Sequence, residues 1–246
     1  MTKFAIFISK LVAATLVALS LTSCNHNIDF ANSITGSGNV VTEKRNVSNF
    51  DKVTVSQGLE CEVFISDKLE VTVEADDNLI NGIHTTIQNG TLDISSEYDN
   101  YINVKSKKII VHMPKIVSLE STSGSTLKSG NTLTAFDILI KSSSGSTLEA
   151  DVEADNITLE TSSGSEQRVK GKALKLNTAS SSGSTIDATG LIANEVFAQS
   201  SSGSSSSVNA AVLLDAKASS GSSINYVGQA KEVRKEESSG GSVSKE

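Results

Sequence analysis

The tripeptide Ser-Gly-Ser, which returns at nearly constant spacing through the second half of the chain, constrains the fold more than any other feature. Six intact copies and one degraded copy have their glycines at Gly124, Gly145, Gly164, Gly183, Gly203, Gly221 and Gly240. The intervals between these glycines are 21, 19, 19, 20, 18 and 19 residues. A repeat of this length is typical of a solenoid in which each repeat forms one coil.

Apolar residues keep a constant distance from each glycine. The position seven residues before it holds Val117, Ile138, Ile157, Leu176, Val196 and Leu214. The position five residues before it holds Leu119, Ile140, Leu159, Thr178, Ala198 and Ala216. The residue four positions before the glycine is polar or charged in most copies, as at Glu120 and Lys141. An alternation with period two predicts strands, because successive side chains of a strand point to opposite faces.

A further apolar column stands three residues after the glycine, at Leu127, Leu148, Ile186 and Ile224. Gln167 and Ser206 take this position in two copies, and Val169 and Val208 follow two residues later. The sequence therefore predicts that the column slips by two residues in these two coils.

Together these columns predict an all-β fold, a single-stranded parallel β-helix with about 19–20 residues per coil. Coils stacked in register rise about 4.8 Å each, so that seven coils make a rod of roughly 30 Å. The column five residues before the glycine shrinks toward Thr and Ala along the chain, which predicts that the later coils are thinner and less stable.

The turn has a physical explanation of its own. Glycine fits where the backbone must take a positive φ, and small serines can bond to nearby backbone groups. Stacked turns place serine hydroxyls in ladders along the rod. We interpret these ladders as architecture that closes the corner of each coil. The alternative is a hydroxyl-lined strip that binds glycans or another surface.

The first 24 residues indicate export. Lys3 and Lys10 precede an apolar run, Leu11 to Leu21, that is too short to span a bilayer. The run ends in Leu21-Thr22-Ser23-Cys24, which resembles the lipobox of bacterial lipoproteins, in which the cysteine is diacylated and becomes the new N-terminus. The resemblance implies a membrane partner through a lipid anchor on Cys24. The alternative is an ordinary signal peptide in which the cysteine is coincidental.

Composition limits the partners and the chemistry. The net charge is −7, and without the two lysines of the export segment it is −9, with no basic cluster, which argues against nucleic acid as a partner.

Candidate reactive and metal-binding residues are few. Cys61 alternates with glutamates, which predicts a buried strand cysteine; the alternative is a reactive thiol. His26, His84 and His112 lie at no metal-binding spacing. Asp76-Asp77 is the best candidate for a pair of functional carboxylates. Because Asn78 follows, we interpret the pair as part of a turn, and the alternative is metal binding or acid–base catalysis. We expect no cofactor and no enzyme activity.

These patterns predict the domain organisation. Residues 1–23 are a lipoprotein signal peptide, and residues 24–35 are a linker from the lipidated cysteine. Residues 36–246 form a single β-helix domain. Within it, residues 36–115 form irregular coils, residues 116–230 form the regular Ser-Gly-Ser coils, and residues 231–246 are a charged cap or a frayed tail.

The mature chain from about residue 36 to residue 230 resembles a known family. The stretches that carry the likeness are Gly36–Val40, Asn49–Val55, Gly58, Glu60–Ile65, Glu74–Leu79, Asn89–Ile94 and the later Ser-Gly-Ser turns. They resemble the head GIN domain family of autotransporter adhesins, which is common among lipoproteins of Bacteroides-like bacteria. The resemblance implies a right-handed parallel β-helix and an adhesin-like role, and it carries no catalytic motif.

Three functions remain open from the sequence. The first is a cell-envelope lipoprotein, on the outer membrane and facing either side of it, that binds a glycan, an extracellular protein or an envelope component. The second is a scaffold or spacer that can self-associate. The third is a β-helix enzyme acting on polysaccharide. A groove or an aromatic platform favours binding, and the chain offers only Tyr98, Tyr101 and Tyr226 and no tryptophan. Clustered carboxylates favour the enzyme, and smooth faces favour the scaffold.

Overall fold

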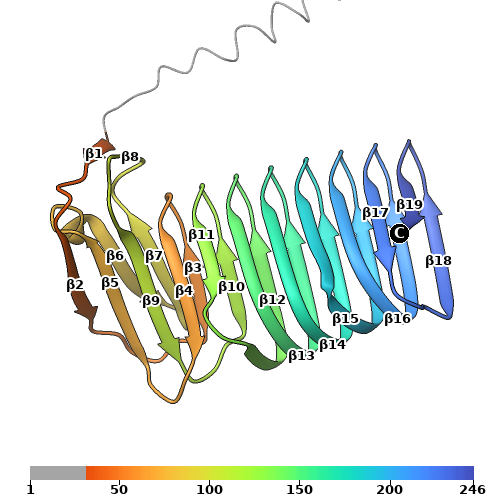
Figure 1. Cartoon of the computed structure of the whole chain (residues 1–246), viewed down its shortest axis with the longest axis horizontal. Helices are drawn as coiled ribbons and strands as arrows, with labels where there is room; N and C mark the ends of the chain where they lie inside the picture. Colours follow the sequence, from red (N-terminus) through yellow and green to blue (C-terminus); the bar gives the residue numbers. More distant parts are fainter. Residues whose placement is uncertain (1–31) are drawn as a thin grey trace, which may run out of the picture. The chain divides into compact units, whose positions relative to one another are not determined.

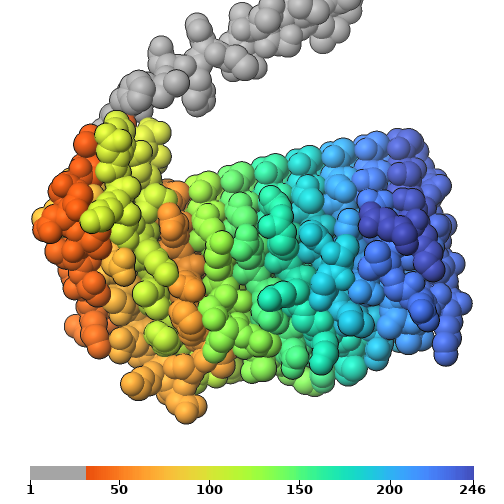
Figure 2. Space-filling view, in the orientation of Figure 1, coloured from red at the N-terminus to blue at the C-terminus, as the bar shows by residue number. Residues whose placement is uncertain are grey.

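The computed structural model describes residues 32–246, which form a β-solenoid of about seven turns (Figure 1). Seventeen strands belong to one continuous sheet that winds around the core. Figure 2 shows the coils as successive bands from the N-terminal to the C-terminal end of this body. The all-β solenoid predicted from the repeat is thus confirmed. Within the described residues, no helix has the length and apolarity needed to cross a bilayer.

The repeats form parallel strands that stay in register from coil to coil. These strands are β10 (Ser118–Ser121), β11 (Thr126–Ser129), β12 (Leu133–Ser142), β13 (Thr147–Thr161), β14 (Glu166–Ser180), β15 (Thr185–Ser200), β16 (Ser205–Ala218) and β17 (Ser223–Val227). The Ser-Gly-Ser turns stand in a row along one edge of the body (Figure 1). We call the side built by the residues before each turn the pre-turn face, and the side built by the residues after it the post-turn face.

The predicted apolar columns point inward. The side chains seven and five residues before the glycine are at most 3% exposed in the second to sixth copies, whereas Val233 and Lys235 of the degraded copy are exposed. In the first copy Ile116 is buried in place of Val117, which is half-buried because β10 begins only at Ser118. The serines or threonine three residues before the glycine are also buried. The core is therefore partly lined with hydroxyl groups.

The predicted slip of the column after the glycine is wrong. Gln167 and Ser206 pair in register with Ile186 and are fully buried. Nε2 of Gln167 donates to the carbonyl oxygens of Ile140 (3.1 Å) and Glu160 (2.9 Å). Inward polar side chains are thus accepted without a change of register, because most of their polar groups find hydrogen-bond partners inside the coil. Among the described residues, Oε1 of Gln167 and Oγ1 of Thr178 are buried without a partner. The valines two residues later belong to a separate inward column.

Ser206 belongs to a small buried hydroxyl cluster. Its Oγ lies 2.9 Å from Oγ of Ser180 and 3.0 Å from Oγ of Ser200. Ser204 joins the same cluster through Ser180, at 3.0 Å. The hydroxyls of these short side chains lie within hydrogen-bonding distance and satisfy one another.

Each turn is a four-residue β-turn with two successive positive φ angles. Ser163 has φ 53° and Gly164 has φ 69°. The amide of Ser165 donates to the carbonyl oxygen of Ser162 at 3.2 Å. These features define a type I′ turn, whose first central residue is here a serine. The sequence predicted the positive φ of the glycine and not that of the serine before it.

The serine after each glycine is buried and joins neighbouring coils. Oγ of Ser204, for example, accepts a hydrogen bond from the amide of Ser201 (3.1 Å) and donates to the carbonyl oxygen of Ser180 in the preceding coil (2.9 Å). Ser146 and Ser222 donate in the same way to Ser121 (2.6 Å) and Ser200 (2.7 Å). For this column the architectural interpretation of the serine ladder is confirmed.

The strands at the N-terminal end do not follow chain order. Their bounds are β2 (Val40–Arg45), β3 (Lys52–Val55), β4 (Glu60–Ile65), β5 (Glu70–Asp76), β6 (Ile83–Gln88), β7 (Thr91–Ser96) and β9 (Lys107–Met113). β3 and β4 adjoin the repeats, β7 and β9 lie outside them, and antiparallel β5, β2 and β6 close the end. A 3-10 turn, η2 (Ile80–Gly82), precedes β6, and β1 (Ser33–Thr35) pairs with β8 (Asn100–Ile102) in a separate two-stranded sheet.

The C-terminal end is a further coil made of β18 (Glu232–Glu237) and β19 (Ser242–Lys245). Its inward positions carry charged side chains that fold over the core. Nζ of Lys235 donates to the carbonyl oxygen of Val243 (3.1 Å) and lies 4.9 Å from the centre of the Tyr226 ring. Glu237 accepts from the amide of Val243 at 2.6 Å. A charged last coil of this kind opposes strand addition from another molecule.

Two glycine substitutions separate backbone strain from steric conflict. At Gly164 (φ +69°) an added Cβ atom would meet nothing within 4 Å, whereas at Gly171 (φ +126°) it would lie 2.0 Å from the carbonyl oxygen of Val152. We expect Gly164→Ala to lower the free energy of unfolding by about 1–2 kcal/mol, the cost of a left-handed backbone. Gly171→Ala should cost more. Urea denaturation of both variants measures this, and equal losses would contradict the explanation.

Candidate functional site

The predicted lipidation residue and the histidine beside it, Cys24 and His26, lie outside the described residues. Cys61 is buried in β4, as the alternation predicted. Burial raises the pKa of its thiol, and the charge of Glu62 raises it further. Because the thiolate is the reactive form, this cysteine is an inert part of the core.

The remaining histidines are separate strand residues. His84 is exposed on β6, and His112 on β9 stacks on Phe64 with ring centres 4.9 Å apart and planes at 16°. In residues 32–246 no group of three or more His, Cys, Asp or Glu side chains is arranged to hold a metal ion.

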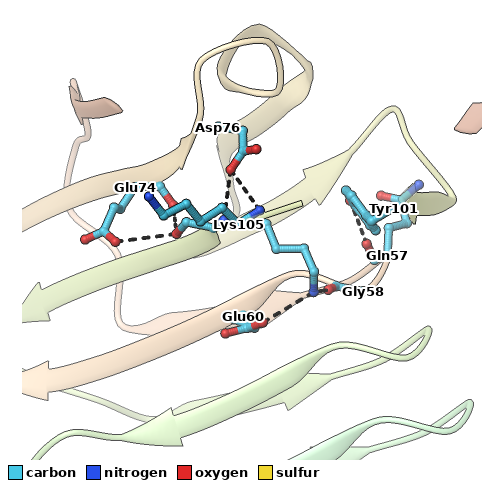
Figure 3. Close-up of polar contacts among 9 residues, drawn as sticks. Gln57, Gly58, Glu60, Glu74, Asp76, Tyr101 and Lys105 are labelled. Atoms are coloured by element: carbon cyan, nitrogen blue, oxygen red, sulfur yellow. Dashed lines mark hydrogen bonds and ion pairs between the residues drawn. The ribbon is translucent and has the colours of Figure 1, made fainter. Parts of the chain in front are cut away.

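The carboxylate pair at the end of β5 is engaged in structure. Asp76 is fully buried and accepts a hydrogen bond from the amide of Gly38 (2.8 Å). It also accepts from the amides of Lys105 (3.0 Å) and Ser106 (2.9 Å), as the two dashed lines at Asp76 in Figure 3 show. Burial opposes the charge, but the three amides outweigh it and hold the pKa of Asp76 below its usual value. Asp77 accepts from Nδ2 of Asn39 at 2.9 Å. The turn interpretation of this pair is confirmed.

Lys107 on β9 ties this end of the solenoid together. Its ammonium group binds the carbonyl oxygen of Gly58 and lies 3.5 Å from the carboxylate of Glu60 (Figure 3). The hydroxyl of Tyr101 donates to the carbonyl oxygen of Gln57 at 2.9 Å. Tyr98, like Tyr101, packs against the core, and Tyr226 is 6% exposed, so these rings stabilise the fold and form no platform for a ligand.

A groove of about 720 Å³ runs along the pre-turn face across the repeat coils. We call it the pre-turn groove. One wall is the outward column four residues before each glycine: Glu120, Lys141, Glu160, Ala179, Gln199, Lys217 and Glu236. The floor is the column two residues before each glycine, from Ser143 through Ser162, Ser181, Ser201 and Ser219 to Ser238. The groove crosses the strands and follows the axis of the rod.

Four of the five charged residues in this wall are paired with one another, and Glu120 is the exception. Lys141 lies 2.8 Å from Glu160, and Lys217 lies 2.9 Å from Glu236. The hydrogen bonds to these glutamates raise the pKa of both lysines. Between the two ion pairs, Ala179 and Gln199 stand side by side and interrupt the sequence of charges.

Hydroxyl groups on the groove floor are available to a ligand. Throughout the described part of the chain, no protein group bonds to the side chains of Ser162, Ser181, Ser201 or Ser219. These serines are half-buried, in contrast to the fully buried serines after the glycines. One turn therefore supplies two kinds of serine, one that joins coils and one that faces the groove.

The post-turn face carries a second groove, of about 750 Å³, whose outward residues are mainly charged. Glu149 lies 3.0 Å from Lys128 and 3.6 Å from Arg168, and Arg168 lies 3.8 Å from Asp187. Surface pairs of this kind stabilise a protein little, but they cancel one another's charge. The charges on this face therefore largely neutralise one another within the protein.

Sequence reasoning missed the pre-turn groove. The signal was present as the neutral residues Ala179 and Gln199 in a column of alternating charges. Their meaning depends on the register, which places them next to each other and next to the free serines.

Asp76→Asn tests the role of the buried carboxylate. Three backbone N–H groups now donate to the two carboxylate oxygens of Asp76, whereas an asparagine side chain has only one acceptor oxygen. We therefore expect a loss of about 1–3 kcal/mol in the free energy of unfolding at pH 7. The folded pKa is below the unfolded value of about 3.9, so the stabilisation is present above that value and is lost as pH falls through the folded pKa. Urea denaturation at pH 7 and about pH 3 should show the difference from the parent shrinking; the exposed Asp67→Asn is the control. An unchanged difference would refute this account.

The comparisons with known proteins agree with this architecture. A putative adhesin from Bacteroides fragilis NCTC 9343 matches with a TM-score of 0.80 at 20% identity, covering 87% of this chain and 100% of that one. A "putative lipid binding protein" from Parabacteroides distasonis ATCC 8503 matches with a TM-score of 0.71 at 20% identity, covering 87% and 99%. No curated protein matches the chain. The family model "Putative auto-transporter adhesin, head GIN domain" matches residues 49–230, and the chain therefore belongs to this family.

Proposed function

We propose that this protein is an adhesin of the cell envelope that binds an external ligand through its solenoid surface and has no enzyme activity. The observation that carries the proposal is the pre-turn groove, whose floor presents hydroxyls without protein partners over successive coils. Family membership supports the adhesive role. These hydroxyls stand at the first residue of each turn, directly after strands that are held in register, so little order has to be imposed on them for binding.

The position of the carboxylates supports a non-catalytic role. Glu160 and Glu236 in the groove wall are each paired with a lysine, and Asp76 is occupied by backbone amides. A glycosidase needs two carboxyl groups facing a common bond, one of them protonated. The carboxylates of this groove are instead spaced along a column, and two of the three are neutralised by lysines.

The proposed anchor is a diacylated Cys24, reached by cleavage of residues 1–23, with residues 24–35 as a linker to a single β-helix domain. The lipobox-like Leu21-Thr22-Ser23-Cys24 supports this, and Asn25 after it fits the outer membrane. Twelve residues can span at most about 40 Å, so the solenoid would stay close to the lipid surface. The serines and charged residues that line the pre-turn groove fit a polar ligand better than an apolar one, although one structural neighbour is named a putative lipid binding protein.

Cys24→Ala tests the anchor. Without the thiol no acyl chain can be added, so the variant should appear as a soluble or unprocessed precursor in carbonate-washed cell fractions. Cys61→Ala is the matched control, because it removes the other, buried cysteine and should leave the protein with the membranes. A Cys24→Ala protein that still fractionates with membranes after the wash would rule out the lipoprotein assignment.

An array of glycans and matrix proteins tests the adhesive role. The chain from residue 25 to residue 246 should bind at least one class of ligand and should release no reducing ends from polysaccharides during prolonged incubation. Absence of any binding would favour the scaffold function, and the appearance of cleavage products would favour the enzyme.

A further inference from the structure

One part of the pre-turn groove differs from its surroundings in carrying no charge. Ala179 and Gln199 lie side by side in the wall, between the Lys141–Glu160 and Lys217–Glu236 ion pairs. On the post-turn face, the corresponding outward positions of β13 and β14 are filled by charges of alternating sign. A ligand that meets the middle of the groove therefore meets neutral side chains.

Hydrogen-bonding groups line this part of the groove, and an apolar ring lies beside it on the same strand, outside the lining residues. In residues 32–246 the side-chain amide of Gln199 and the hydroxyls of Ser181 and Ser201 have no hydrogen-bond partner. Phe197 is half-buried and faces outward from the same strand as Gln199. Nζ of Lys175 lies 4.6 Å from the centre of the Phe197 ring, and Asp215 stands beside Phe197 in the next coil, so charged residues border the ring. We call Ala179, Ser181, Phe197, Gln199 and Ser201 the neutral segment.

We propose that the neutral segment binds an uncharged glycan whose chain lies along the pre-turn groove. The proposal rests on the adhesive function and names its ligand class. A pyranose ring has apolar C–H faces and a rim of hydroxyls, and the neutral segment offers an aromatic ring, an amide and hydroxyls to match. The free serines recur once per coil, about every 4.8 Å, close to the length of one sugar in an extended chain.

Other polymers fit this groove less well. A polyanion or polycation would have to break the ion pairs on either side, since their charges are already satisfied. A peptide that binds by strand addition needs free backbone groups, but the strands under the groove are paired on both sides. An acyl chain would leave the free hydroxyls and the amide without partners, which costs free energy.

Isothermal titration calorimetry of the protein as purified from its cells tests the assignment. The probes are cellohexaose, mannohexaose and galactohexaose, with hexagalacturonate as the charged counterpart. At least one neutral hexasaccharide should bind and hexagalacturonate should bind more weakly. Ala179→Arg, which places a long charged side chain in the exposed wall, should weaken binding about tenfold or more, and Gln199→Ala should weaken it severalfold. Ser207→Arg, on the post-turn face of the neighbouring strand, is the matched control and should change nothing.

The outcomes separate this inference from the adhesive function. Three results would overturn the neutral segment as the site. Ser207→Arg could weaken binding as much as Ala179→Arg does, neither groove variant could change binding, or the protein could prefer hexagalacturonate. A protein that binds none of the hexasaccharides but binds a matrix protein on the array would overturn the glycan assignment and leave the adhesin intact. Circular dichroism of each variant confirms that a loss of binding is not a loss of fold.

Discussion

The fold depends on the strict register with which one coil stacks on the next. Each strand is satisfied by backbone hydrogen bonds to the coils on both sides, and the buried serine after each glycine adds a side-chain bond to the preceding coil at the corner. This bond holds the corners level, so that a residue at a given distance from one glycine lies beside its counterpart in the next coil. Columns of like position follow from this, and so do the core, the ion-pair ladders and the groove.

The register also explains which polar residues can be buried. Gln167 reaches across the coil to two backbone carbonyls, and Ser180, Ser200 and Ser206 bond to one another. Shifting a strand by two residues would bury valine in place of glutamine or serine but would misplace every other column of the coil. Retaining the register and bonding the polar groups internally is the less costly solution.

Much of this could be predicted from the sequence because the repeat shows each position several times. Six copies identify Ile157 and Leu159 as inward and Glu160 as outward without knowledge of the fold. The positive φ of Ser163 could not be predicted, because serine has no strong preference for that conformation. The order of strands before Met113 was also hidden, since parallel and antiparallel strands show the same alternation. The groove required the register itself, because only stacking places Ala179 beside Gln199.

The interleaved N-terminal end has a consequence for how the chain can fold as it is made. β3 and β4 emerge early, yet the residues of β7 and β9 that pair with them come 39 and 48 residues later. The first complete layer therefore cannot form until the chain has been released as far as Met113. From then on each new stretch of about 19 residues can add to an existing template, one layer at a time. A chain that leaves a membrane pore N-terminus first would start slowly and then grow in steps, and the charged last coil would end that growth.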